Sequence, residues 1–187
     1  MTKAALRAAM RAARGAVPNG ERRRVEAAVR ARALACPRVR GADAVCLYAS
    51  IGDELDTRPL IDALLSRGDA VYLPRLGQAP GEMTFRRLRG ADALEPGRFG
   101  VPAAPAGAEP LRPRGKRVTV LMPGLAFDSA DGVRLGMGGG YYDRAIAAIR
   151  TEAAEVFAAG LCFACQVVPD VPRDPWDLAA DAVWCGG

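Results

Sequence analysis

The segment from Arg134 to Arg144 is rich in glycine and reads RLGMGGGYYDR. Glycine loses much backbone entropy on folding, so four glycines in eleven positions indicate that something must approach this backbone closely. Main-chain N–H groups without Cβ atoms can converge on one anion, as they do in phosphate-binding nests. A helix expected to begin near Tyr141 would add its positive end and its unpaired N–H groups. The segment therefore predicts a phosphate-binding site.

Two charged side chains within this segment extend the prediction to a nucleotide triphosphate. The guanidinium of Arg134 offers a fork of donors to phosphate oxygens. The carboxylate of Asp143 can hold Mg²⁺, which usually binds one or two carboxylates together with substrate phosphates. The spacing fits neither the Walker loop nor the dinucleotide fingerprint. The alternative is a tight strand-to-helix connection in which Asp143 is only an acidic residue of the first turn.

The chain contains no histidine, and this excludes whole classes of chemistry. Ser-His-Asp and Cys-His catalysis and histidine-ligated zinc are ruled out. Its five cysteines are odd in number and scattered, which argues against a disulfide framework. Cys162 and Cys165 form a CxxC without a second pair, so we interpret them as small apolar residues of a buried strand. A redox or metal site at this pair is the alternative.

Length and composition indicate one domain spanning residues 1–187, because half of the residues are hydrophobic and can bury one core. No run approaches the roughly 20 apolar residues of a membrane span, and the start lacks the apolar region of a signal peptide. A mitochondrial-type presequence is the alternative for this basic, acid-poor start. We expect a cytoplasmic protein without a membrane partner.

The net charge of +5 is unevenly distributed, since residues 1–40 carry eleven basic and two acidic side chains. A nucleic-acid footprint is one interpretation of this basic segment. No aromatic residue precedes Tyr48, however, and no nucleic-acid motif is present. We therefore expect the solvated faces of two helices and no nucleic-acid partner.

The hydrophobic pattern predicts strands that alternate with helices. Thr2 and Thr57 are expected helix caps, and residues 95–115 form a Pro/Gly-rich surface loop. Such alternation favours an α/β fold with a mostly parallel sheet flanked by helices on both faces, with ligands beyond the carboxyl ends of its strands. The expected helices are 2–14, 20–35, 57–68 and 141–154; the expected strands are 43–50, 70–76, 83–89, the opening of 117–128, 156–166 and a short piece at 182–184.

Residues 122–144, MPGLAFDSADGVRLGMGGGYYDR, closely resemble the characteristic motif of the 5-formyltetrahydrofolate cyclo-ligase family, also called methenyltetrahydrofolate synthetases. The resemblance covers nearly the whole chain, because further segments follow in family order. They are KAALR (3–7), YASIGDELDT (48–57), YLPR (72–75), MTF (83–85), FGVP (99–102) and the ending VVPDVPRDPWDLAADAV.

The resemblance implies a three-layer α/β sandwich and a monomeric enzyme that uses ATP and Mg²⁺ to convert 5-formyltetrahydrofolate, its reduced folate substrate, into 5,10-methenyltetrahydrofolate, ADP and phosphate. It also implies site residues. Lys3 and Arg7 would reach the ATP phosphates, with Lys3, Arg134 and Asp143 catalytic. The further nucleotide contacts would be Gly136, Met137, Gly138, Gly139, Gly140, Tyr141 and Tyr142; the folate contacts would be Ala49, Glu54 and residues 137–141; the Mg²⁺ ligands would be Asp143 and Asp177.

The chemistry implied by the resemblance suits a chain without histidine. A formamide oxygen is a poor nucleophile and a poor leaving group, and transfer of a phosphoryl group to it allows a second folate nitrogen to displace it. Phosphoryl transfer needs mainly positioning and charge neutralisation. Glu54 can accept two adjacent pterin donors in a bidentate contact, whereas the alternative is a solvated loop acid. Asp53 and Asp56 could take its place, but the family register favours Glu54. One of the two tyrosines, 141 or 142, is expected in the core.

Four positions depart from the family pattern. Gly139 stands where many relatives carry lysine, Met137 where an aromatic or basic residue is common, Trp176 where histidine is frequent, and Ala103 where an acid often follows the turn. Two other functions stay open from the residues alone. One is a different ATP- or phosphate-ester-handling enzyme of the same broad fold, and the other is a binding module such as a folate or nucleotide sensor or an RNA binder.

Overall fold

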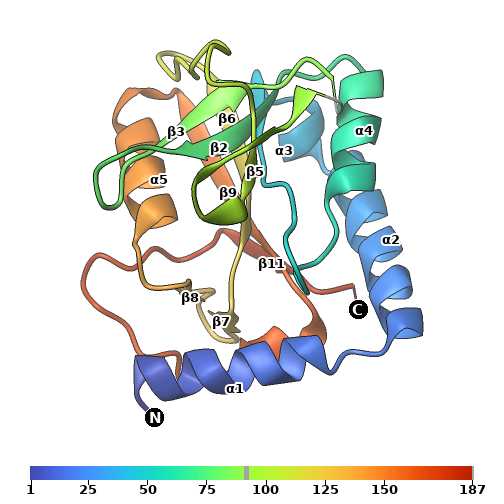
Figure 1. Ribbon diagram of the computed structural model, residues 1–187, viewed down its shortest axis with the longest axis vertical. Helices are drawn as coiled ribbons and strands as arrows, with labels where there is room; N and C mark the ends of the chain where they lie inside the picture. The colour runs from blue at the N-terminus through green and yellow to red at the C-terminus, as the bar shows by residue number, and fades with distance from the viewer. Residues whose placement is uncertain (91–92, 187) are drawn as a thin grey trace.

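The computed structural model describes residues 1–90 and 93–186, which form a six-stranded central sheet (Figure 1). Its strands lie in the order β11-β9-β6-β1-β2-β3. Every neighbouring pair is parallel except β2 and β3, which are antiparallel. The mostly parallel sheet predicted from the alternation of elements is therefore confirmed. The strands are β1 (Ala44–Cys46), β2 (Val71–Leu76), β3 (Met83–Arg87), β6 (Arg117–Pro123), β9 (Glu155–Leu161) and β11 (Ala182–Trp184).

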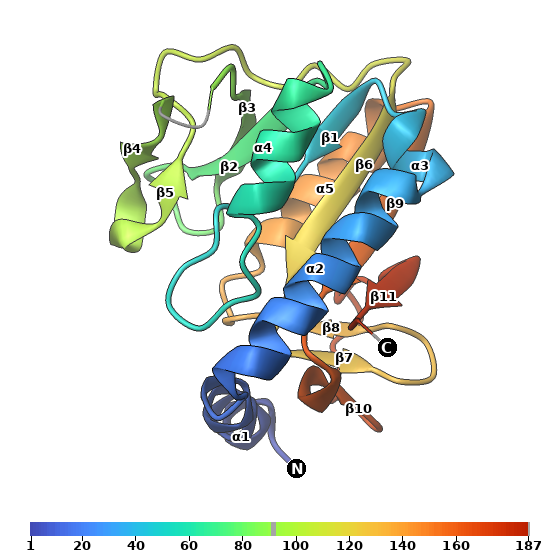
Figure 2. The same cartoon turned by 90° about the vertical axis from the view of Figure 1, so that its right-hand side faces the viewer.

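Helices cover both faces of this sheet, as Figure 2 shows. One face carries α2 (Asn19–Ala35), α3 (Pro37–Arg40) and α4 (Arg58–Ser66), and the other carries α5 (Tyr141–Glu152). The central strand β1 is apolar throughout because both of its faces are covered. Val45 packs in the cluster with α2 and α4, whereas Ala44 and Cys46 pack in the cluster with α5. Successive side chains of a strand point to opposite faces, so a strand covered on both faces needs apolar residues at every position. The three-layer fold is confirmed.

The first helix, α1 (Lys3–Gly15), lies across the end of the sheet toward which the arrow of β6 points (Figures 1 and 2). Leu6 is buried against a small sheet of strands in the order β10-β7-β8, in a cluster with Val133 and Leu135. Thr2 caps the helix as predicted, because its side chain accepts a hydrogen bond from the N–H of Ala5. The helix is thus part of the fold and lies beyond the carboxyl ends of the parallel strands. The small sheet comprises β7 (Ala126–Asp128), β8 (Arg134–Leu135) and β10 (Val167–Val168).

The segment 95–115 is more regular than a surface loop. It contains an antiparallel pair of short strands, β4 (Glu95–Pro96) and β5 (Pro102–Ala103), joined through a 3-10 turn, η2 (Arg98–Gly100). The turn is tight because the N–H of Gly97 donates to the carbonyl of Val101. Arg75 fixes the pair to β2 by donating to the carboxylate of Glu95 at 3.1 Å.

Two local predictions were wrong. Thr57 stands before α4, but its hydroxyl donates to the carbonyl of Tyr48, and the carboxylate of Asp56 accepts from the N–H of Arg58 instead. The strand expected over 156–166 ends at Leu161, so Cys165 lies exposed in the 3-10 turn η3 (Ala164–Gln166) rather than in a buried strand. The helix expected over 20–35 ends at Ala35 as predicted, and Pro37 begins the short helix α3, because proline suits the first position of a helix.

Two further findings concern the expected buried cysteine and membrane-spanning helices. Cys162 is buried and behaves as the expected apolar residue of the strand end. Among the residues that the structure describes, no helix has both the length and the apolar character needed to cross a membrane.

Candidate functional site

The glycine segment joins β8 to α5 and lies next to α1. Gly138 has φ +105°, and Gly140, the residue before α5, has φ +61°, in the region that side chains with a Cβ avoid. A Cβ on Gly139 would lie 2.4 Å from the ring of Tyr141, and one on Gly136 would lie 2.5 Å from the guanidinium of Arg134. The backbone conformation therefore requires glycine, and it leaves the main chain bare at the amino end of α5. Such a bare turn before a helix can hold an anion.

Cations of α1 lie along this segment. The Nε atom of Arg7 donates to the carbonyl of Gly136 at 2.9 Å, and a Cβ on Gly138 would lie 3.4 Å from Nη2 of Arg7. Lys3, one helical turn earlier, lies on the same face of α1. The structure therefore brings Arg7 to the glycine segment, with Lys3 on the same face of α1.

The ammonium of Lys3 is held by two carboxylates of the chain's last segment. Its Nζ atom lies 2.6 Å from Asp174 and 2.5 Å from Asp177. Burial alone would lower the pKa of Lys3, but the hydrogen bonds and charges of these two aspartates outweigh burial and raise it. The pKa of Asp177 is likewise held below its ordinary value, since the contact with Lys3 outweighs burial. Lys3 is thus a charged donor that faces anionic oxygens.

Arg134 and Asp143 contact each other. Nη2 of Arg134 lies 2.9 Å from Oδ2 of Asp143, and the side chains are only 6% and 12% exposed. The other carboxylate oxygen accepts from the N–H of Leu178 at 3.3 Å. The guanidinium also stacks over the ring of Tyr142, 5.4 Å from its centroid, and its buried Nε has no hydrogen-bond partner in the part of the chain that the structure describes. Two residues predicted to serve the nucleotide are therefore already an ion pair.

The structure brings Asp143 and Asp177 to the same region, because Leu178 contacts the former and Arg134 lowers the pKa of the latter. Within residues 1–90 and 93–186, no three acidic or cysteine side chains form a ready metal cage. Two carboxylates nevertheless suit a hard cation that keeps several waters and is shared with phosphate groups. The donor set therefore fits Mg²⁺ that arrives with a nucleotide.

Glu54 belongs to the loop that leaves the carboxyl end of β1 and lines a cavity of about 620 Å³. Its carboxylate accepts from the N–H of Ile51 at 3.0 Å, and burial raises the pKa of Glu54. The cavity lies between α2, this loop and the η2–β5 segment. Its lining residues are Asn19, Arg22, Arg23, Glu26, Ser50, Ile51, Gly52, Glu54, Asp56, Arg58, Gly100 and Pro102.

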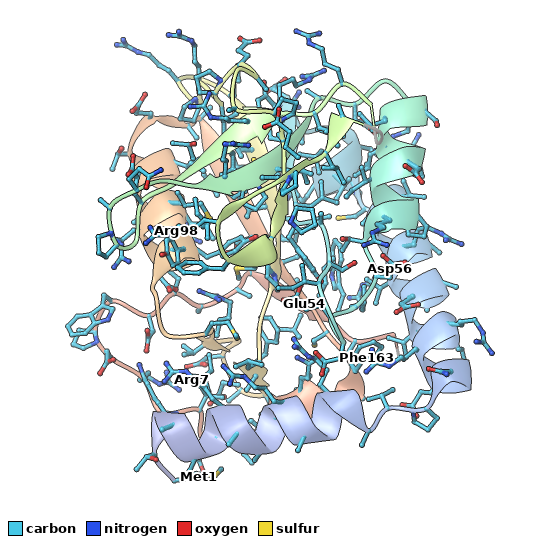
Figure 3. All side chains as sticks on the ribbon, viewed as in Figure 1. Met1, Arg7, Glu54, Asp56, Arg98 and Phe163 are labelled. Atoms are coloured by element: carbon cyan, nitrogen blue, oxygen red, sulfur yellow. The ribbon has the colours of Figure 1, made fainter. Side chains whose placement is uncertain are left out.

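Glu54 also faces the layer of α5. Burial raises the pKa of Tyr48 and of Tyr142, and the charge of Glu54 raises both further. Tyr142 packs edge-on against Phe85 with ring centroids 6.2 Å apart, so it is the core tyrosine expected of the pair. Its buried hydroxyl has no hydrogen-bond partner within residues 1–90 and 93–186. Figure 3 shows Glu54 near the middle of the molecule and Asp56 on the side of α2. Glu54 therefore lies between the cavity and the elements that carry the glycine segment.

The remaining predicted residues differ in their environment. Ala49 is buried in the core cluster, so any ligand contact there would use its main chain. Met137 is 66% exposed, and Arg11 lies 3.6 Å from its sulfur. Asp53 is paired with Arg14 at 2.6 Å, and Asp56 accepts from the hydroxyl of Ser50.

Sequence reasoning missed several residues of this region. Asp174, the second partner of Lys3, lies in a tail without a distinctive pattern, and only its position near Asp177 could have suggested it. Arg23 and Arg58 line the cavity but resemble other exposed arginines of an arginine-rich chain. No local pattern marks them.

Comparison with known proteins places the chain among enzymes of folate metabolism. A profile of the 5-formyltetrahydrofolate cyclo-ligase family matches residues 1–186. The 5-formyltetrahydrofolate cyclo-ligase of Escherichia coli K12 is 32% identical over 153 residues, 81% of this chain and 82% of the relative. The mouse enzyme of the same name is 27% identical over 97% of this chain and 92% of its own length. The solved structure of Aquifex aeolicus 5,10-methenyltetrahydrofolate synthetase superposes with a TM-score of 0.80 at 29% identity, covering 100% of this chain and 90% of that one.

Proposed function

Since the chain belongs to the 5-formyltetrahydrofolate cyclo-ligase family and is therefore a ligase, we propose that it closes 5-formyltetrahydrofolate to 5,10-methenyltetrahydrofolate with consumption of Mg-ATP. The observation that carries this proposal is the adjacency of two unlike sites. One is a bare glycine turn surrounded by Lys3, Arg7 and Arg134, and the other is a cavity whose inner carboxylate is Glu54. The reaction transfers a phosphoryl group from ATP to the formyl oxygen of the folate, so the nucleotide and the pterin must be bound side by side.

The glycine turn is proposed to bind the ATP phosphates. Its main-chain N–H groups and the amino end of α5 offer donors without steric obstruction. Arg7 already contacts this turn through Gly136, and Lys3 already binds two anionic groups. Phosphate oxygens would replace the carboxylates of Asp174 and Asp177 as acceptors for Lys3. The chain's cations would thus neutralise the charge that the phosphates bring.

Mg²⁺ would be held by Asp143 and Asp177 together with phosphate oxygens. When bound, the ion supplies charge neutralisation at the phosphates. Asp143 would loosen its contact with Arg134, and the freed guanidinium would then turn its donors to the phosphate oxygens.

The folate would place its pterin against Glu54. Adjacent ring N–H and amino groups match the two oxygens of one carboxylate, and such charge-assisted bidentate contacts are strong and selective. The formyl oxygen would then attack the γ-phosphorus, with ADP as the leaving group. N10 of the folate would attack the activated formyl carbon, lose its proton and expel phosphate, closing the ring. No protein nucleophile is required for these steps. We further propose that the protein acts on its small reduced folate as a monomer in the cytoplasm.

Absorbance tests the proposal directly, because 5,10-methenyltetrahydrofolate absorbs in the near ultraviolet. Folded protein mixed with 5-formyltetrahydrofolate and Mg-ATP should produce this absorbance, and omission of ATP or chelation of Mg²⁺ should abolish it. Phosphate release should match ring closure one to one. Absence of turnover in protein with a cooperative melting transition would overturn the proposal.

A further inference from the structure

Two arginines of the cavity beside Glu54 have no side-chain partner among the residues that the structure describes. Arg23 projects from α2, and Arg58 is the first residue of α4; both are exposed and both line the cavity. Within residues 1–90 and 93–186, neither guanidinium donates a hydrogen bond or forms an ion pair. The two elements converge at this end, so the two cations face the same space from different helices.

The other charged groups of the cavity are already bonded within the chain. Arg22 donates to the carbonyls of Val17, Asp53 and Arg14 and stacks over Phe163. The carboxylate of Glu26 accepts from the N–H of Asp56, and that of Asp56 accepts from Ser50. Arg22, Glu26 and Asp56 therefore hold the wall together, while Arg23 and Arg58 are the cavity's available cationic donors among the described residues.

The cavity has a carboxylate on one side and two arginines on the other, so it can orient an elongated ligand. Glu54 lies on its inner side, close enough to Tyr142 of α5 for its charge to raise the pKa of that hydroxyl. Arg23 and Arg58 lie on the helices of the opposite layer. A ligand that places one end at Glu54 and its reacting atoms toward the glycine segment must extend its other end toward these two arginines.

We propose that Arg23 and Arg58 form a subsite for the carboxylates at the amino-acid end of the reduced folate. This inference rests on the proposed function, which supplies a ligand with a pterin at one end and a glutamyl residue with two carboxylates at the other. A guanidinium fork matches a carboxylate in geometry and charge. The subsite sets the affinity for the folate and leaves the chemistry at the phosphate unchanged.

Steady-state kinetics test the subsite with Arg23→Ala, Arg58→Ala and the double variant. The control is Arg24→Ala, the neighbouring exposed arginine of α2, which does not line the cavity. Each cavity variant should raise KM for 5-formyltetrahydrofolate about threefold to fivefold, the range of a solvent-exposed ion pair. The double variant should raise it about tenfold, with kcat and KM for ATP unchanged. High salt should raise KM of the unmodified protein more than that of the double variant.

A truncated substrate gives the decisive comparison. 5-Formyltetrahydropteroate lacks the glutamyl residue, so it should bind the unmodified protein and the double variant equally. Equal KM values for the full substrate in all variants, an equal rise in Arg24→Ala, or a rise that persists with the truncated substrate would each overturn the subsite.

Binding separates this inference from the proposed function. If the unmodified protein shows no turnover, the proposed reaction fails, and calorimetric titration with 5-formyltetrahydrofolate then tests the subsite alone. Weaker binding in the double variant than in Arg24→Ala would support the subsite. Equal binding in both, or no binding by the unmodified protein, would overturn it.

Discussion

Arg134 and Asp143 form a nearly buried ion pair, with 2.9 Å between Nη2 of the arginine and Oδ2 of the aspartate. The pair connects β8 to the first turn of α5 and so fixes both ends of the glycine segment. Breaking a buried pair by removing one partner is costly, because the other charge is left uncompensated. The same two residues are proposed to serve the nucleotide, so their structural and functional roles must be separated by experiment.

Asp143→Asn should therefore reduce stability as well as activity. We expect a loss of about 3 kcal/mol, or a fall of roughly 6–12 °C in Tm. At temperatures where the variant is folded, the Mg²⁺ concentration for half-maximal rate should rise. Glu109→Gln, which breaks an exposed pair with Arg89, should change neither quantity appreciably. An unchanged Mg²⁺ requirement in folded Asp143→Asn would remove this residue from the metal site.

Gly138→Ala should impair nucleotide binding through backbone strain. The position has φ +105°, and its Cβ would meet Arg7 only at 3.4 Å, so the conformation rather than a collision opposes the change. A left-handed conformation costs a residue with a Cβ about 1–2 kcal/mol, so kcat/KM for ATP should fall about fivefold to thirtyfold. The control is Gly20→Ala in α2, where the added Cβ would meet no other described residue within 4 Å apart from its chain neighbours and the backbone of its own helix. Equal kinetics in the two variants would show that the turn does not bind the nucleotide in this form.

Glu54→Gln should weaken folate binding without weakening the fold. The amide loses the bidentate acceptor, so KM for the folate should rise about tenfold to a hundredfold. Because burial raises the pKa of Glu54, its charged form is disfavoured in the folded state, and the neutral isostere should leave Tm at pH 7 unchanged or higher. Glu26→Gln keeps the acceptor for Asp56 and should change KM less. A larger effect of Glu26→Gln than of Glu54→Gln on KM would show that Glu54 is not the carboxylate that binds the pterin.

The pH dependence of folate binding should follow the same carboxylate. The raised pKa of Glu54 means that this side chain gains its proton at a higher pH than an ordinary glutamate. KM for the folate should therefore rise as pH falls below neutrality, and Glu54→Gln should remove this rise. The sign for stability is opposite: the contribution of Glu54 is present below the ordinary pKa of 4.5 and is lost as pH rises through the raised one. An identical acid limb of KM in both proteins would contradict this assignment.

Lys3→Met should raise KM for ATP about tenfold or more, since charge-assisted hydrogen bonds to phosphate would be lost. Lys116, the other lysine of the chain, precedes β6 at the amino end of the sheet, so Lys116→Met is the matched control. Asp174→Asn removes one competing acceptor of Lys3 and should leave KM for ATP unchanged or lower it. A rise of KM in Asp174→Asn equal to that in Lys3→Met would indicate that the contact is only structural.

The sequence predicted the place of the site better than its internal contacts. The glycines and the strand-helix alternation located a bare turn at the carboxyl end of the sheet, because both depend on local backbone chemistry. The pairing of Arg134 with Asp143 could not be predicted, since two residues nine positions apart in sequence do not necessarily meet in the fold. The sequence pattern also did not predict that the strand ends at Pro123 and that a separate strand, β7, begins at Ala126. Gly124 marks this break, because a Cβ there would lie 2.6 Å from the ring of Phe127, but this contact arises only in the folded chain.

Some differences reflect tertiary contacts that override a local preference. Thr57 has the chemistry of a helix cap, yet its hydroxyl is buried and donates to Tyr48. Arg23 and Arg24 are adjacent, exposed and chemically identical, and only the position of the loop from β1 places one of them in the cavity wall. Such distinctions depend on what lies opposite a residue, which its own sequence neighbours do not encode.

The contact of Lys3 with Asp177 joins residues 174 positions apart in sequence. During synthesis on the ribosome, α1 emerges before the segment that carries Asp177 and cannot complete this arrangement until that segment has also left the exit tunnel. A partly made chain would hold the glycine turn and Arg7 but lack the carboxylates that position Lys3.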